Sequence, residues 1–172
     1  MNAYIYQLFI GPDAPFLPLA VYLVLAGTAV WDAWRGIVPN IPLALAALAI
    51  TIGRYLADGW QDAATFLALG AGAWLFIWVF NELWFRIFKK DAIGMGDAKW
   101  TAVAVAAFGV MPALFAWFAG AWVAIIWIIG SYLIGRRIRK VFFAPFLMVG
   151  LTLGLLVTRG IITLPYPLTL GG

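Results

Sequence analysis

The chain has 172 residues, of which 66% are hydrophobic and 10% are charged, and its formal net charge is +4 at pH 7. Soluble domains carry about 25% charged residues, so this composition excludes a soluble globular protein and indicates an integral membrane protein. The sequence contains no histidine and no cysteine, which excludes Ser-His-Asp and Cys-His catalysis, structural zinc sites and disulfides. We expect one all-α, polytopic membrane domain over residues 1–172.

Residues 1–15 contain no basic residue, so they are interpreted as an interfacial lead-in and not as a cleavable signal peptide. Six apolar segments follow, at residues 16–33, 40–57, 61–88, 97–108, 112–135 and 143–163. A membrane-spanning helix needs about 17–25 residues. The fourth segment is too short to cross fully, and we expect a helix shielded by its neighbours. Gly109 and Pro112 predict the break that follows it.

The loop charges predict how about six transmembrane helices are oriented. One side of a six-span arrangement receives nine basic residues: Arg35, Arg86, Lys89, Lys90, Lys99, Arg136, Arg137, Arg139 and Lys140. The other side receives Arg54 and Arg159. The positive-inside rule then places the nine-residue side in the cytoplasm and both termini outside it. The excess of basic residues is therefore interpreted as a signal that orients the chain among membrane lipids, and we expect no nucleic-acid partner.

Asp32 stands at the cytoplasmic end of the first segment, in the stretch WDAWRG. The helix macrodipole disfavours an anion at a helix C-terminus by about 0.3–1 kcal/mol. One interpretation is a solvated aspartate that pairs with Arg35, three residues further along the same helical face. The other interpretation is a carboxylate that is retained for chemistry.

Asp97 follows Gly94, Met95 and Gly96 and opens the fourth segment. A structural interpretation is a helix N-cap, for which aspartate is a favoured residue. The two glycines also allow a peptide backbone to approach closely. If folding gathers Asp32 and Asp97, the two carboxylates cannot both stay ionised and would share a proton. Aspartic proteases use this arrangement.

Several other residues allow a structural interpretation beside a functional one. Glu82 is an ionisable residue within an apolar segment and so a functional candidate, or it pairs with Arg86 at i+4. An interfacial belt and lipid-facing packing explain the ten tryptophans. Close helix contacts explain four glycines within the segments: Gly70, Gly72, Gly120 and Gly130.

Three stretches resemble the type IV prepilin peptidases, which belong to the GxGD group of intramembrane aspartic proteases. DAWRGIVPN, from Asp32 to Asn40, resembles the D-x(6)-P-N signature of that family. GMGDAK, from Gly94 to Lys99, is similar to its G-x-G-D-x-K motif. FAPFLMVG, from Phe143 to Gly150, resembles the P-F-L stretch that opens the last helix. The resemblance extends from residue 16 to about residue 160, and without the cysteine-bearing segment of larger members it matches the short form found with Flp (tight-adherence) pili.

The resemblance implies a membrane aspartic endopeptidase with Asp32 and Asp97 as the catalytic pair. The residues it implies in substrate binding or support are Gly94, Gly96, Lys99, Arg35, Pro39, Asn40 and Pro145. The implied substrate is a prepilin, with a basic leader before an apolar helix, cut at the cytoplasmic face of the bacterial inner membrane. We expect no metal and no cofactor. The family's second activity, N-methylation of the product, stays open, because the sequence shows no glycine-rich turn for S-adenosylmethionine.

Two other functions stay open at this point. Paired intramembrane carboxylates also build proton relays, so the chain could be a small proton-coupled transporter. Such a protein is expected to hold an acid near the bilayer midplane, whereas Asp32, Glu82, Asp91 and Asp97 all fall near one face. The chain could also be a non-catalytic pilus-assembly subunit, against which only the presence of both aspartates argues.

Overall fold

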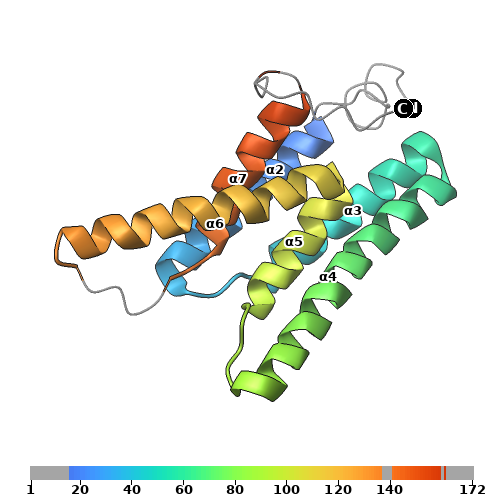
Figure 1. Cartoon of the computed structure of the whole chain (residues 1–172). Helices are drawn as coiled ribbons and strands as arrows, with labels where there is room; N and C mark the ends of the chain where they lie inside the picture. Colours follow the sequence, from blue (N-terminus) through green and yellow to red (C-terminus); the bar gives the residue numbers. More distant parts are fainter. Residues whose placement is uncertain (1–15, 137–140, 160, 162–172) are drawn as a thin grey trace, which may run out of the picture.

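The computed structural model describes residues 16–136, 141–159 and 161, and its regular elements there are all α-helices (Figure 1). The expected lead-in over residues 1–15, the basic residues Arg137, Arg139 and Lys140, and the end of the sixth segment lie outside the described residues. The six helices are α2 (Phe16–Arg35), α3 (Asn40–Asp58), α4 (Trp60–Phe88), α5 (Met95–Phe108), α6 (Val110–Leu133) and α7 (Ala144–Thr158). The predicted all-α class is confirmed.

Four of these helices are long and apolar enough to cross a membrane, namely α2, α3, α4 and α6. Helix α5 has 14 residues, in line with the expected short fourth segment. Helix α7 has 15 residues and ends at Thr158, so the expected sixth segment over residues 143–163 is not a full-length helix within the described residues. The structure therefore supports four candidate spans, one shorter apolar helix, α7, and the short helix α5.

The break between α5 and α6 falls at Gly109, whose φ of 88° lies in the left-handed region that favours glycine. Pro112 does not break a helix, because it lies in the first turn of α6, where no intrahelical donor is lost. Gly59 separates α3 from α4 in the same way, with a φ of 89°. The predicted break is therefore confirmed at the glycine and wrong at the proline.

Successive helices alternate in direction, so α2, α4 and α6 end, and α3, α5 and α7 begin, toward the same side of the molecule (Figure 1). We call this the loop end, which comprises residues 36–39, 89–94 and 141–143. Residues of all three stretches line one cavity there. The two sequence motifs and the start of the last helix thus meet although they are far apart in the chain.

Helix α5 is the centre of the packing and touches each of the other five helices. Trp100 and Ala104 on α5 have 0% exposure, as have Leu25 on α2 and Leu147 on α7. The Trp100 indole Nε1–H donates to the Leu25 carbonyl oxygen at 3.2 Å, which satisfies its polar atom in the core. The expected interfacial or lipid-facing position is therefore wrong for Trp100, which lies in the core.

Small residues bring the helix backbones close together at two contacts. A Cβ added at Gly120 would lie 2.7 Å from the Phe146 carbonyl oxygen of α7, and one at Gly70 would lie 2.8 Å from the Ala102 carbonyl oxygen of α5. These are the close contacts expected of small residues between membrane helices. Gly72 and Gly130 have no atom within 4 Å of an added Cβ, so the expected contact is wrong for these two.

Candidate functional site

The cavity at the loop end has a volume of about 460 Å³. It is lined by Asp32, Gly36, Ile37, Val38, Asn40, Gly94, Met95, Gly96, Asp97, Lys99, Val141, Phe142 and Phe143. Both predicted catalytic aspartates are in this set, together with the predicted supporting residues Gly94, Gly96, Asn40 and Lys99. Arg35, Pro39 and Pro145 are not among the lining residues. We call this space the aspartate cavity.

Asp32 lies in the last turn of α2 and is 6% exposed. The backbone N–H of Ala144, the first residue of α7, interacts with its carboxylate. This N–H is one of the free donors at a helix start, so it stabilises a negative charge there. The alternative pairing with Arg35 is not formed among the described residues, and the Arg35 guanidinium lies 5.6 Å from the centroid of the exposed Trp31 ring.

Asp97 lies in the first turn of α5, a helix outside the four candidate spans, and its side chain is half-buried. Gly94 occupies the N-cap position and no side chain caps this helix, so the expected N-cap role of Asp97 is wrong. Burial raises the pKa of Asp97 from 3.8 to about 7, and the nearby charge of Asp32 adds to the shift. Near neutral pH, Asp97 can therefore hold a proton beside an acidic neighbour.

Because the two motif glycines have no side chain, they leave room for other residues of the site. A Cβ added at Gly94 would lie 3.1 Å from Oδ2 of Asp97. A Cβ added at Gly96 would lie 2.9 Å from Cγ2 of Val38, a residue of the first motif. The start of α5 can therefore lie this closely against the loop between α2 and α3 only without a side chain at Gly96. Their predicted role toward a substrate backbone stays a prediction.

A hydrogen bond also joins the two motifs at the rim of the aspartate cavity. The Lys99 Nζ donates to Asn40 Oδ1 at 3.0 Å, which connects the second turn of α5 to the first residue of α3. Pro39 is the N-cap residue of α3, with an extended backbone. Pro145 is in the first turn of α7, where a fixed φ suits a helix start. These two prolines shape the elements around the cavity without lining it.

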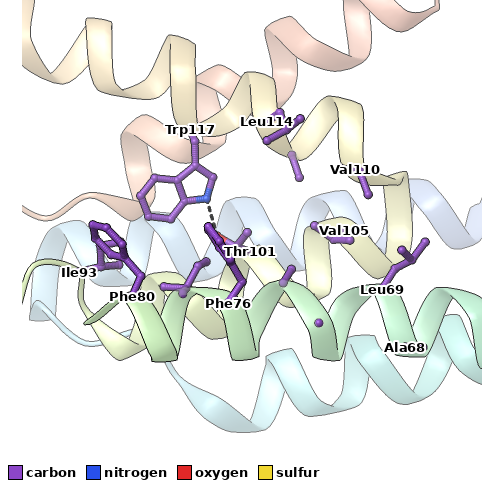
Figure 2. A pocket seen from close by; sticks show the side chains of 14 residues that line it. Ala68, Leu69, Phe76, Phe80, Ile93, Thr101, Val105, Val110, Leu114 and Trp117 are labelled. Atoms are coloured by element: carbon purple, nitrogen blue, oxygen red, sulfur yellow. Dashed lines mark hydrogen bonds between the residues drawn. The ribbon is translucent and has the colours of Figure 1, made fainter. Parts of the chain in front are cut away.

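Thr101 and Trp117 support Asp97, although the sequence indicated no role for either residue. The Thr101 hydroxyl donates to the Asp97 carbonyl oxygen at 2.8 Å, and the Trp117 Nε1–H donates to that hydroxyl at 3.0 Å (Figure 2). This chain of bonds joins α6 to the first turn of α5. The sequence signal for Thr101 is its place four residues after Asp97, whereas nothing in the sequence pairs Trp117 with α5.

An apolar groove of about 610 Å³ lies between α4, α5 and α6 (Figure 2). Its lining residues are Ala68, Leu69, Gly72, Ala73, Phe76, Ile77, Phe80, Ile93, Thr101, Val105, Val110, Ala113, Leu114 and Trp117. Thr101 is one turn from Asp97, and Ile93 belongs to the loop that leads into α5. The groove therefore extends from the middle of the bundle to the immediate neighbourhood of Asp97.

The other acidic residues near the loop end have partners of their own. Glu82 accepts a hydrogen bond from Arg86 at 3.0 Å, so the i+4 pairing is the interpretation that the structure supports. Asp91 accepts a hydrogen bond from Asn81 at 3.3 Å. In the part of the chain that the structure describes, no group of three acidic residues could hold a metal ion.

The aspartate cavity brings two carboxylates with different surroundings to one space. Asp32 is buried with the Ala144 backbone N–H beside its carboxylate, and Asp97 is at a position that favours its neutral form. Such a pair can take a proton from a water molecule with one carboxyl group and give a proton to a carbonyl oxygen with the other. Comparisons of this chain with protein-family models, with curated proteins and with solved structures found no match.

Proposed function

We propose that this chain is a membrane aspartic endopeptidase of the prepilin peptidase type, with Asp32 and Asp97 as its catalytic residues. One observation carries the proposal: the aspartates of two separate motifs line one cavity, and the charge of Asp32 contributes to the raised pKa of Asp97. The D-x(6)-P-N and GxGD spacings resemble that family, and the contacts between Gly96 and Val38 and between Lys99 and Asn40 support a joint role for the two motifs.

The surroundings of the two carboxyl groups support separate roles in hydrolysis. Ionised Asp32 removes a proton from a water molecule, whose oxygen attacks the scissile carbonyl carbon. Protonated Asp97 gives its proton to the carbonyl oxygen, which produces a neutral tetrahedral diol. When the diol collapses, Asp32 passes its proton to the departing amide nitrogen and Asp97 recovers a proton from a diol hydroxyl. The C–N bond breaks, and the pair returns to its starting state.

The orientation follows from the charges at the loop end. The described basic residues there are Arg35, Arg86, Lys89, Lys90, Lys99 and Arg136, whereas Arg54 and Arg159 belong to the opposite end. The positive-inside rule supports a cytoplasmic loop end, six alternating passes and both termini outside. The aspartate cavity then faces the cytoplasm at the surface of the bacterial inner membrane.

The substrate that fits this arrangement is a prepilin, whose basic leader precedes an apolar helix. The apolar groove offers a surface for that helix within the membrane, where a polar lining would be costly. Because the groove reaches Thr101 and Ile93, a helix in it would begin next to Asp97. The scissile bond would then lie at the level of the aspartate cavity, with the leader in the cytoplasm.

Co-expression of the chain with a Flp-type prepilin tests the proposal. Mass spectrometry of the membrane fraction is expected to find the pilin cut just before its apolar helix. Asp32→Asn and Asp97→Asn, each alone, are expected to abolish the cut, while immunodetection shows unchanged insertion of the protein. Intact prepilin with the unaltered chain, or full cleavage by either variant, would refute the proposal. Proton flux into vesicles that depends on Asp97 without any cleavage would favour the transporter alternative.

A further inference from the structure

Asn81 is a buried polar residue on α4, about two turns before the end of that helix. It is 8% exposed, and its side chain makes three hydrogen bonds. Its Oδ1 accepts from the backbone N–H groups of Ala92 at 2.8 Å and Ile93 at 3.1 Å. Its Nδ2 donates to Oδ1 of Asp91 at 3.3 Å. One side chain therefore binds three consecutive residues of the loop between α4 and α5.

This loop leads directly into the first turn of α5, which carries Asp97. Helix α4 ends at Phe88 with Lys89 in a left-handed conformation, and α5 begins after Gly94. Gly94 is also the residue whose missing side chain leaves room for the Asp97 carboxylate. A displacement of residues 91–93 would therefore change where Gly94 lies and how α5 starts.

Two features make Asn81 suited to hold this loop. The backbone N–H groups of Ala92 and Ile93 are donors that no helix ladder pairs, and the buried Asn81 Oδ1 accepts from both of them. Asparagine supplies an acceptor and a donor from one side chain, so it binds both amides and the Asp91 carboxylate. Ile93 also lines the apolar groove, as does Phe80, the residue directly before Asn81 on α4 (Figure 2).

We propose that Asn81 is a positioning residue: it holds residues 91–93 against α4 and thereby sets the position of Asp97 in the aspartate cavity. The consequence for catalysis rests on the proposed function, whereas the hold on the loop does not. Leucine at this position would bind none of the three groups. Aspartate would still accept from both amides but would set a second carboxylate against Asp91.

Steady-state cleavage of a prepilin by the purified chain tests the consequence for catalysis. Asn81→Leu is expected to lower kcat about 100-fold and to leave KM within about threefold, because a displaced catalytic group affects the chemical step. Asn81→Asp is expected to lower kcat about tenfold. Adding Asp91→Asn to Asn81→Asp is expected to restore kcat to within about threefold of the unaltered chain, since an amide then faces the introduced carboxylate.

Single-cysteine labelling tests the hold on the loop without any need for activity. The chain contains no cysteine, so Ile93→Cys introduces one thiol at a half-buried position whose backbone N–H Asn81 binds. In an Asp97→Asn background, Asn81→Leu is expected to raise the rate of maleimide labelling in membranes about fivefold or more, as released loops open more often. Glu82→Gln, which alters only the neighbouring ion pair with Arg86, is the matched control and is expected to leave both readouts unchanged.

The outcomes separate this inference from the proposed function. Unchanged labelling with Asn81→Leu would overturn the inference, whatever the activity. Faster labelling with normal kcat would also overturn it, because Asp97 would then not depend on the loop. If the unaltered chain cleaves no prepilin, the proposed function fails, and labelling alone decides whether Asn81 holds the loop. Equal loss of kcat in Asn81→Asp with and without Asp91→Asn would contradict the stated role of the 81–91 contact.

Discussion

The carboxylates at the two ends of the bundle have different surroundings. At the end opposite the loop end, Asp62 accepts a hydrogen bond from Arg54 at 3.2 Å, and the guanidinium also lies 3.5 Å from the Phe66 ring centroid. At the loop end, Asp32 and Asp97 have no ion pair within the described residues, although one is buried and the other half-buried. A carboxylate with a nearby cation is stabilised as an anion, whereas one without it can keep a proton.

This difference indicates which acidic residues are candidates for a catalytic role. The sequence places four acidic residues near the loop end, and their residue type and position alone do not distinguish them. Glu82 and Asp91 turn out to have partners on or near α4. Asp32 and Asp97 instead share a cavity. The unpaired carboxylates are therefore the candidates for acid–base work, and the paired ones serve as internal controls.

The largest expected effect contrasts the unpaired carboxylates with the paired ones. Asp32→Asn and Asp97→Asn are each expected to lower the prepilin cleavage rate about 10³-fold or more, because each removes the proposed general acid or base. Asp62→Asn and Glu82→Gln are expected to keep the cleavage rate within about threefold of that of the unaltered chain. Initial rates in proteoliposomes measure this. If Asp97→Asn stays active while Asp91→Asn is inactive, the wrong acid has been assigned.

The pH dependence of cleavage sharpens the same contrast. The pKa of Asp97 is about 7, and the proposed mechanism uses its protonated form as the acid, so the rate is expected to fall about tenfold per pH unit above that value. Initial rates between pH 5 and pH 9 measure the fall. Asp62→Asn is the control and is expected to keep the same profile. A rate that still rises at pH 9 would contradict the role of Asp97 as the acid.

Two glycines with open space around them test the apolar groove. Gly72 lines the groove and Gly130 does not, and neither has an atom within 4 Å of an added Cβ. Gly72→Trp is expected to raise KM about tenfold, because the indole would fill space needed by the apolar helix of the substrate. Gly130→Trp, the matched control, is expected to leave KM unchanged. Equal changes in KM from both substitutions would contradict a role of the groove in substrate binding.

The smallest expected effect is on stability, and its sign differs between the two ends. Because the pKa of Asp97 is raised above 3.8, the folded protein binds its proton more tightly than the unfolded chain. That contribution is present below pH 3.8 and is lost as pH rises through 7. At pH 8, Asp97→Asn is therefore expected to increase the free energy of unfolding by about 1–3 kcal/mol.

Asp62→Asn provides the opposite case. It breaks the ion pair with Arg54 and is expected to lower the free energy of unfolding by at most about 1 kcal/mol at the same pH. Thermal unfolding in detergent at pH 4 and pH 8 measures both variants. The gain from Asp97→Asn should shrink at pH 4. A loss of stability at pH 8 from Asp97→Asn would contradict the burial argument.

Much of the fold could be predicted from the sequence, because runs of apolar residues and glycine breaks are local signals. The predicted segments lie within a few residues of the observed helices, apart from the shorter α7. The core position of Trp100 could not be predicted in this way. A tryptophan at a membrane surface and one in a core look the same until the partner of the indole N–H is known, here the Leu25 carbonyl oxygen.

The sequence alone determined that this is an α-helical membrane protein with acidic motifs at the ends of apolar segments, because composition, hydropathy and spacing are properties of the chain itself. Only the tertiary structure decided which acids share a cavity. It also decided that Gly96 fits against Val38 and that Asn81 holds the loop before Asp97. These relations join residues on different helices, and their distances depend on how the helices pack.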